Sequence, residues 1–415
     1  MTRAVHVVGA GLAGLAAALR LADAGRAVTL HEAGPAAGGR CRSYWDRELG
    51  CRLDNGNHLL LSGNDAVWAY VDRIGSRGTF TGPSRPLVPF MDLATDERWA
   101  VAPNLGRVPW WVLRDRVPGT YLSEYLDLLA LRRAGPQATV AGTLRHRTLF
   151  HRLLEPLAIA GLNTMTDTGS ARLLAAIVDG TLGRGGRACI PALPREGLSE
   201  SLIDPAVAAI EAKGGQVLTG SRVQGLVLEG GRASALRTPA GQVPLGPDDA
   251  IVLAVPCTGA AALLPGLVVP DAFESILNLH YRAEASPPGA VGEAGLVGLV
   301  GGFSEWVFVK PGVLSVTVSA ANRYQDETPD TLAARAWPEV CRAVGLPPQP
   351  MPPHRVVREK RATFAATPAQ DARRPGPRTA WGNVALAGDW TATGLPATIE
   401  GAIRSGNTAA EILLA

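Results

Sequence analysis

A glycine-rich turn near the N-terminus constrains the fold more than any other feature of this chain. The β-branched run AVHVV leads into Gly9, Gly11 and Gly14, and a run of small apolar residues follows. A second apolar run, AVTLHEA, carries Glu32 near its end, 21 positions after Gly11. The order strand, glycine turn, helix, strand predicts a βαβ unit, and hence an α/β fold with a parallel sheet.

Each glycine of this turn has a mechanical reason to be there. Gly9 permits the tight turn, Gly11 lets backbone N–H groups approach a pyrophosphate, and Gly14 lets the helix and the strand pack closely. The intervening Leu12 and Ala13 open the helix, whose N-terminus favours the phosphate charge. The turn therefore predicts that the chain binds a dinucleotide.

The acidic end of the second strand supports this prediction. Glu32, followed by Ala33, can accept hydrogen bonds from ribose hydroxyls. A glycine-rich turn without function is the alternative, and the strand, helix and acidic residue in register weigh against it. The chain has no second turn of this kind after a strand, so we expect no separate nicotinamide domain.

The composition indicates a compact, apolar globular protein. Of the 415 residues, 47% are hydrophobic and 19% are charged, and the net charge is +3. This charge is too small and too evenly spread to predict a nucleic-acid partner. Five cysteines without CxxC spacing argue against disulfides and against a metal site, and they favour the cytosol. The uncharged stretch 250–270 is broken by prolines, so it predicts a buried strand and a loop rather than a membrane span.

The segment 38–60 allows three interpretations: a metal or redox site, an anion cradle, or an ordinary hairpin. Its glycine pair lets the backbone crowd a ligand, and the arginine that follows is a charged donor fork suited to a diphosphate. We expect two strands flanking the turn WDRELG, with the second strand returning toward the cofactor. The expected cofactor contacts in this segment are Gly38, Gly39, Arg40, Gly56, Asn57 and His58.

The phrase GGRCRS, which follows Glu32 within a few residues, resembles the signature of the flavin-containing amine oxidase and carotenoid desaturase superfamily. In that superfamily FAD lies extended across such a loop. The C-terminal phrase NVALAGDWTATGLPATIEGAIRSGNTAAEILLA predicts a strand and then a helix from about Thr398. The resemblance assigns Asp389 to a ribityl hydroxyl and the helix N-terminus to the N1–C2=O edge of the flavin, where a helix N-terminus stabilises negative charge. It assigns Val223 a backbone contact to adenine, in a β-meander expected over GGQVLTGSRVQGLVLEGGRASALRT; a plain meander is the alternative. The further contacts that it implies are Gly388, Pro396, Ala397 and Thr398.

Three longer phrases resemble the hydroxysqualene dehydroxylase family more narrowly: GGRCRSYWDRELGCRLDNGNHLLLSGN, EPLAIAGLNTMTDTGSARLLAAIVDGTLG and PREGLSE. The resemblance implies a Rossmann-like FAD-binding domain of the GR2 type with a discontinuous α+β substrate domain. We predict that residues 1–85, 196–282 and 375–415 form the FAD-binding domain, and that 86–195 and 283–374 form the substrate domain. The implied reaction is the removal by reduced FAD of the hydroxyl of hydroxysqualene, giving squalene for bacterial hopanoid synthesis.

That reaction requires a proton donor and an aromatic face near the flavin. The hydroxyl leaves as water, and the resulting allylic cation takes hydride from flavin N5. We predict His58 as the donor, because the equivalent segment passes beside the isoalloxazine ring in superfamily relatives. We predict Trp390 as an aromatic wall. A structural role is the alternative for both side chains.

The substrate also constrains where the protein works. At about 0.8 kcal/mol per CH₂, thirty carbons represent more than about 20 kcal/mol of transfer from water. We therefore expect a cytoplasmic protein that associates peripherally with the inner face of the cytoplasmic membrane, or that collects substrate from an upstream squalene-pathway enzyme. Trp110 and Trp111 beside Arg107, Arg114 and Arg116 are typical of a lipid-headgroup surface. One buried Trp, one exposed Trp and a solvated basic face is the alternative.

Three other functions compete with this one. A carotenoid or phytoene desaturase would run hydride transfer from substrate to FAD. An amine oxidase would commonly need a lysine-held water near N5, and the chain has few lysines (Lys213, Lys310 and Lys360). A flavin-binding protein that catalyses no reaction is the third alternative.

Overall fold

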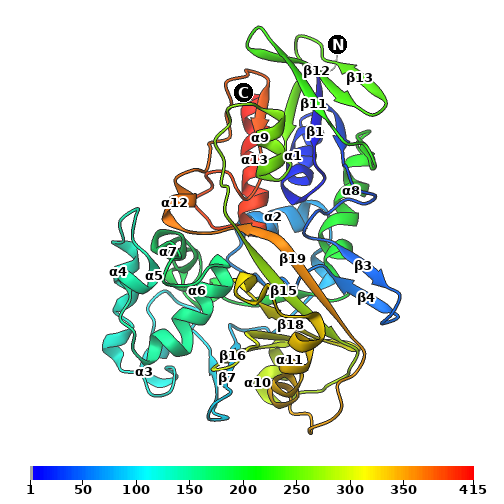
Figure 1. Cartoon of the computed structure of the whole chain (residues 1–415). Coiled ribbons are helices and arrows are strands. Elements are labelled where there is room, and N and C mark those ends of the chain that lie inside the picture. Colours follow the sequence, from blue (N-terminus) through cyan, green and yellow to red (C-terminus); the bar gives the residue numbers. More distant parts are fainter. Residues whose placement is uncertain (1–2) are drawn as a thin grey trace.

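Two large sheets organise the fold, and the smaller of them is the parallel sheet that the N-terminal motif predicts (Figure 1). The computed structural model describes residues 3–415. The strands of this sheet follow the order β10-β2-β1-β14-β20, and every pair is parallel. Their bounds are Ala4–Val8 (β1), Ala27–His31 (β2), Gln216–Leu218 (β10), Ala250–Leu253 (β14) and Val384–Leu386 (β20). Three distant parts of the sequence therefore meet in one sheet.

Helices from both ends of the chain pack together on this sheet. Figure 1 shows α1 and α13 side by side beside β1. A Cβ added at Gly406 would collide with the Ala13 carbonyl oxygen, so the glycine at this position lets the two helices pack closely. The helices around this sheet are α1 (Leu12–Asp23), α2 (Asp65–Arg73), α8 (Asp204–Glu211), α9 (Cys257–Leu263) and α13 (Ile399–Leu414).

The larger sheet has seven strands in the order β19-β15-β18-β17-β16-β7-β8, and only the β16–β7 pair is parallel. Its bounds are Val88–Asp92 (β7), Arg98–Val101 (β8), Phe273–Tyr281 (β15), Leu296–Val300 (β16), Trp306–Lys310 (β17), Val313–Val318 (β18) and His354–Phe364 (β19). Helix α11 (Pro329–Val344) packs against it, and the Tyr281 hydroxyl donates to the Ala333 carbonyl at 2.8 Å. Helix α10 is Gly289–Ala294.

Short helices form a separate region between β8 and β9 (Figure 1). Their bounds are Trp111–Arg114 (α3), Asp127–Arg132 (α4), Val140–Thr143 (α5), Glu155–Leu162 (α6) and Ala171–Gly180 (α7); α12 is Pro368–Asp371. Asn163 joins this region to the large sheet, because its side chain accepts from the Ala320 N–H at 2.7 Å and donates to Thr363 Oγ1 at 2.9 Å. Trp111 is buried against Tyr125, whereas Trp110 is exposed, so the prediction of a surface Trp pair is wrong for Trp111.

Small antiparallel sheets complete the fold. The predicted hairpin of segment 38–60 is present as β3 (Ser43–Asp46) and β4 (Cys51–Asp54). The meander consists of β11 (Gly225–Glu229), β12 (Arg232–Thr238) and β13 (Gly241–Pro244). The run QVL, expected in that meander, instead forms β10 of the parallel sheet. The last small sheet has the order β5-β9-β6, with bounds Leu60–Leu61, Pro191–Pro194 and Phe80–Thr81.

The domain division stays a prediction, and most strands follow it. All five strands of the parallel sheet come from the three predicted FAD-binding segments. The exception in the other sheet is β15, which lies before residue 282 but pairs with β18 and β19. The first segment of the predicted substrate domain supplies β7 and β8, and β7 pairs with β16 about 200 residues away. Sequence patterns do not predict pairing at that separation.

Candidate active site

The N-terminal turn has the geometry that its glycines predict. Gly9 adopts φ +107°, and an added Cβ would lie 2.6 Å from the Ala254 carbonyl oxygen. A Cβ on Gly14 would collide with the Gly9 carbonyl, so Gly14 permits close helix packing. Gly11 differs from both, because an added Cβ would meet no atom within 4 Å. The turn is therefore tightly packed at Gly9 and Gly14 and leaves open space at Gly11.

The start of α1 faces this space. Gly11 is the N-cap and supplies no side chain to the free N–H groups of the first turn, where Leu12 and Ala13 lie. The loop of Gly39 lies close to this turn, because a Cβ added to Gly39 would be 3.5 Å from the Gly11 Cα. The Gly38 N–H fixes this loop by donating to the Ala10 carbonyl at 2.8 Å. Unpaired amides of a helix N-terminus between two glycine loops fit a diphosphate.

Glu32 organises the loop at the end of β2. Its two carboxylate oxygens accept from the Ala10 N–H at 2.9 Å and from the Gly34 N–H at 2.7 Å. Its backbone carbonyl accepts from the Ser221 N–H at 2.8 Å, which brings the segment holding Val223 next to the loop of Glu32 and Ala33. Each carboxylate oxygen keeps a free lone pair. The predicted adenosine contacts therefore lie together, and binding through them stays a prediction.

Arg40 and Asp389 bind each other. Arg40 Nη2 donates to both Asp389 carboxylate oxygens at 2.7 Å, and Nη1 donates to the Ala362 carbonyl at 2.5 Å. We expected Arg40 to hold a diphosphate and Asp389 to hold a ribityl hydroxyl. The structure gives the two residues a direct ion pair, because the loop after Gly39 and the loop after β20 meet here. These bonds use only part of the five N–H donors of Arg40, so the remaining donors would be the ones available to a diphosphate.

Arg374 is a site residue that the sequence did not reveal. Its side chain is fully buried and donates to the Asp389 carbonyl at 3.1 Å, to Thr393 Oγ1 at 2.8 Å and to Asp371 Oδ1 at 3.0 Å. It therefore fixes the backbone on which Asp389 sits. Arg374 follows Arg373 in the phrase DARRPGP, which matches no motif, so only the fold identifies its role.

The loop after β4 places polar groups against the large sheet. Asn57 Nδ2 donates to Thr317 Oγ1 at 3.0 Å, and that hydroxyl donates to Asn278 Oδ1 at 2.9 Å. Asn278 is 1% exposed and also donates to the Asn55 carbonyl at 3.3 Å. The buried Asn57 Oδ1 has no hydrogen-bond partner among the described residues. It is an acceptor that an N–H or O–H of a bound molecule can satisfy.

His58, the predicted proton donor, lies at the end of this loop. Its Nδ1 is 3.0 Å from the Gly56 carbonyl oxygen, which can only accept, so Nδ1 carries a proton and Nε2 faces away from this bond. Burial lowers the pKa of His58 from its ordinary value of 6.5, against the raising effects of the Gly56 bond and of Asp54. The imidazole is therefore mostly neutral at pH 7, with Nε2 as an acceptor. To act as an acid it must first take up a proton.

The C-terminal helix begins where the sequence predicts. Thr398 is the N-cap of α13 and accepts from the Gly401 N–H at 3.0 Å, after Pro396 and Ala397. Glu400 is buried, and its carboxylate accepts from the Ala66 and Val67 N–H groups at 3.1 and 2.9 Å. It thus caps α2. The glutamate of the C-terminal motif therefore joins the two ends of the chain.

Trp390 lies in the apolar core beside this region. It is 3% exposed, and its indole N–H donates to the Val255 carbonyl at 3.0 Å. Gly388, at φ +152°, leaves the space that the indole fills. Its burial and its bond to Val255 give Trp390 a structural role, and the aromatic wall for a substrate stays a prediction.

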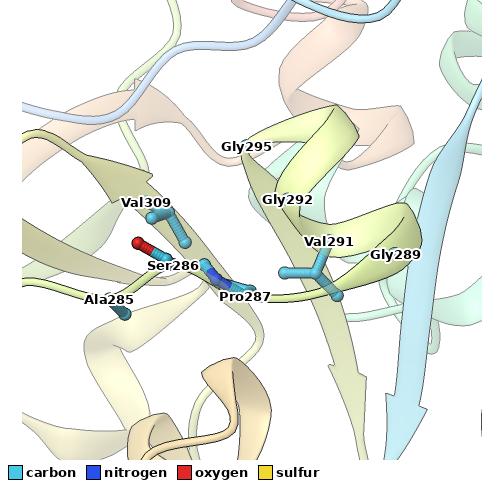
Figure 2. Close-up of a pocket in the computed structure, with 8 residues that line it drawn as sticks. All are labelled: Ala285, Ser286, Pro287, Gly289, Val291, Gly292, Gly295 and Val309. Carbon is cyan, nitrogen blue, oxygen red and sulfur yellow. The ribbon is translucent and has the colours of Figure 1, made fainter.

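Cavities elsewhere are separate from these residues. One of about 420 Å³ lies beside α10, where Figure 2 shows Val291 opposite Pro287, Ser286 and Val309. A second, of about 710 Å³, is lined by polar side chains that include His146, His151 and Arg152. Neither cavity contains a predicted cofactor contact. Residues 3–415 hold no group of three or more His, Cys, Asp or Glu side chains placed to bind a metal ion.

Comparison with known proteins identifies the relatives of this chain. A family model described as flavin containing amine oxidoreductase matches residues 12–286 and 297–414. The hydroxysqualene dehydroxylase of Rhodopseudomonas palustris is 48% identical over 100% of this chain and 99% of that protein. The proteins of the same name from Sinorhizobium fredii and Zymomonas mobilis are 45% and 41% identical, and each covers at least 98% of both partners.

Solved structures show the same fold. An oxidoreductase from Methanosarcina mazei has a TM-score of 0.75 at 14% identity, covering 98% of this chain and 99% of its own. Putrescine oxidase bound to putrescine has a TM-score of 0.72 at 17% identity, covering 100% of both chains. These matches confirm the predicted α/β fold with a Rossmann-like sheet. The chain belongs to the flavin containing amine oxidoreductase family and, within it, to the hydroxysqualene dehydroxylases.

Proposed function

We propose that this protein binds FAD and catalyses the reductive dehydroxylation of hydroxysqualene to squalene. The observation that carries the proposal is the identity of 41–48% with three hydroxysqualene dehydroxylases over essentially the whole chain. The match to a probable zeta-carotene desaturase, in contrast, covers 17% of this chain. Similarity over the whole chain includes the region that would hold the substrate as well as the cofactor motif.

The arrangement of the site supports FAD as the flavin. The space at Gly11 and Gly39 fits a diphosphate, and Glu32 at the end of β2 would meet an adenosine ribose. The start of α13 and the loop ending at His58 would hold the flavin ring, to which the unpartnered Asn57 Oδ1 offers an acceptor. When bound and reduced, FAD supplies the hydride.

The side chains of the protein would supply the rest of the reaction. The substrate C–O bond breaks, the oxygen leaves as water with one added proton, and the carbon gains hydride. His58, protonated at Nε2, is our candidate for that added proton. Its Nδ1–H bond to Gly56 would orient the ring. The network of Asn57, Thr317 and Asn278 would fix the loop that carries it.

The lysines argue against amine oxidase chemistry of the lysine-held-water type. Lys310 donates to Asp54 Oδ2 at 2.5 Å, and that carboxylate is 3% exposed, so Lys310 is held in a buried ion pair. Lys213 pairs with Asp23 at 2.7 Å. Lys360 is exposed on β19. Two of the three lysines are therefore held in ion pairs, and the third is exposed on the surface.

The substrate supports peripheral attachment to the inner face of the cytoplasmic membrane. A thirty-carbon hydrocarbon is almost absent from water, because its transfer costs more than about 20 kcal/mol. No helix within residues 3–415 has the length and apolar character to cross a bilayer. The protein would therefore collect substrate at a membrane surface, or from the enzyme that makes it.

Anaerobic single-turnover measurements test the proposal. Photoreduced holoenzyme is mixed with detergent-solubilised hydroxysqualene, and we expect the flavin to reoxidise while one squalene forms per flavin. In a parallel experiment, oxidised enzyme is mixed with phytoene, a desaturase substrate, or with putrescine, an amine oxidase substrate. Reduction of the flavin by either compound, with no squalene formed from hydroxysqualene, would replace the proposal with desaturase or amine oxidase chemistry.

A further inference from the structure

Exposed apolar side chains are concentrated in one part of the molecule. Eleven large hydrophobic residues are exposed in the described chain, and eight of them fall within residues 105–129. We call this the 105–129 surface. Its exposed apolar members are Leu105, Val108, Trp110, Leu113, Tyr121, Leu122, Leu126 and Leu129. Scattered single residues of this kind are normal, whereas eight in one short segment mark an interaction site.

Buried anchors hold this segment in place. Trp111 packs edge-on against Tyr125 with ring centroids 5.5 Å apart, and the Tyr125 hydroxyl accepts from the Val117 N–H at 2.9 Å. Glu124 is 2% exposed and accepts from the Tyr121 and Leu149 N–H groups at 2.8 Å. These anchors point inward. The apolar side chains between them therefore project outward from a fixed backbone.

The charges of the surface have one dominant sign. Arg107, Arg114 and Arg116 are exposed, and Asp115 is the exposed acid among them. Within residues 3–415, Arg107 and Arg114 form no ion pair. The other two acids of the segment, Glu124 and Asp127, are buried, and Asp127 pairs with Arg145. Arginines around exposed Trp, Tyr and Leu match the anionic headgroup layer of a bilayer.

The position of the surface suits delivery of an apolar molecule. Figure 1 shows α3 and α4 at the outer edge of the helical region, away from the parallel sheet. The buried Trp111 and Val112 beneath the surface belong to the same apolar cluster as Trp390 beside the cofactor site. The surface therefore lies over one end of the large apolar core that also contains Trp390.

We propose that the 105–129 surface docks the protein on an anionic lipid bilayer, with Trp110 and the leucines at headgroup depth. The choice of a bilayer over a protein partner rests on the proposed function, because a thirty-carbon substrate dissolves in a bilayer. The surface itself, with its arginines and apolar residues, stands independently of any reaction.

Vesicle sedimentation of the holoenzyme tests the docking surface. We compare phosphatidylcholine vesicles with and without phosphatidylglycerol, and expect binding to the anionic vesicles. The variant W110S/L126S removes side chains that are 63% and 61% exposed, and it should bind at least about tenfold more weakly. The matched control W45S/V268S removes side chains that are 62% and 60% exposed elsewhere, and it should bind like wild type.

The arginines give a second readout. R107Q/R114Q should lose about fivefold in affinity per arginine for anionic vesicles only, and the loss should disappear at high salt. Flavin content and thermal unfolding report whether each variant folds. Wild type that stays in solution with both vesicles, or W110S/L126S that binds like its control, would overturn the proposal. The proposal would also be overturned if wild type failed to bind vesicles but formed a dimer, and W110S/L126S dissociated that dimer. The surface would then join two copies of the chain.

The docking test is separate from the test of the reaction. Sedimentation uses no substrate, and the single-turnover assay uses substrate in detergent. Turnover without vesicle binding would refute only the docking surface. Vesicle binding without squalene formation would refute only the proposed reaction.

Discussion

The glycine at the crossing of the two terminal helices gives the sharpest test of the cofactor site. Gly406 of α13 lies against the Ala13 carbonyl of α1, and an added Cβ would fall well inside 3.0 Å of that oxygen. The collision is with backbone, which cannot rotate away as a side chain can. In Gly406→Ala the two helices must separate by roughly 1 Å, or the helix ends must tilt.

Two free energies of opposite sign decide the outcome of this substitution. Replacing a helical glycine by alanine stabilises the helix by about 1 kcal/mol. Overpacking a filled contact costs about 1–3 kcal/mol, and a backbone neighbour places the cost at the upper end. We therefore expect net destabilisation of about 1–2 kcal/mol. On the proposed binding mode, α1 and α13 would present their N-termini to FAD, so flavin affinity should fall by about tenfold or more.

The same substitution elsewhere is the matched control. Gly180 ends α7, and a Cβ there would meet nothing within 4 Å. Gly180→Ala should therefore be neutral or stabilising by up to about 1 kcal/mol. Flavin dissociation constants from fluorescence titration, and denaturant unfolding of apo and holo protein, measure both variants. Gly406→Ala that keeps wild-type flavin affinity and matches the stability of Gly180→Ala would refute the argument from close helix packing.

Three further substitutions test single residues of the site. If protonated His58 is the acid, single-turnover rates should fall as the pH rises through its lowered pKa, below 6.5, and His58→Gln should remove this dependence while the flavin stays bound. Arg374→Met should weaken flavin binding about tenfold by freeing the backbone of Asp389, and Arg374→Lys should restore only part of the affinity, since lysine lacks the planar fork. Lys310→Met should destabilise the protein by about 3–5 kcal/mol at neutral pH, because it leaves buried Asp54 without its cation. Burial raises the pKa of Asp54 and Lys310 lowers it, so Asp54 should have a higher pKa in the variant than in the wild type. Denaturant titration should therefore show the loss shrinking as the pH falls from the variant's higher Asp54 pKa toward the lowered pKa of the wild type. A constant loss across that pH range would contradict the ion-pair explanation.

Local features of the site could be predicted because their causes are local. The turn through Gly9 and Gly14 depends on backbone geometry within a few residues, and the sequence shows both glycines and the flanking apolar runs. The start of α13 likewise follows from Pro396 and the N-cap Thr398. The hairpin β3–β4 follows from two short runs around a polar turn.

Features that depend on distant contacts could not be predicted in this way. Strand β10 has only three residues, and its place beside β2 depends on pairing across almost 190 positions. Trp110 and Trp111 are neighbours in sequence, yet the orientation of a four-residue helix buries one and exposes the other. Asn278 and Arg374 belong to no motif, and their roles appear only when β15 and the loop before β20 meet the site.

The distinction between local and distant causes also explains how far each motif identifies the cofactor. The glycine turn alone fits any dinucleotide, because its geometry suits the diphosphate that all dinucleotides share. The groups that would face a flavin ring come from the other end of the chain and from the loop after β4. Contacts such as Arg40 with Asp389 and Glu400 with α2 join the two ends of the chain. Each of these contacts needs both ends of the chain in register. The joint occurrence of the two motifs therefore points to one composite site, and it is stronger support for a flavin than either motif by itself.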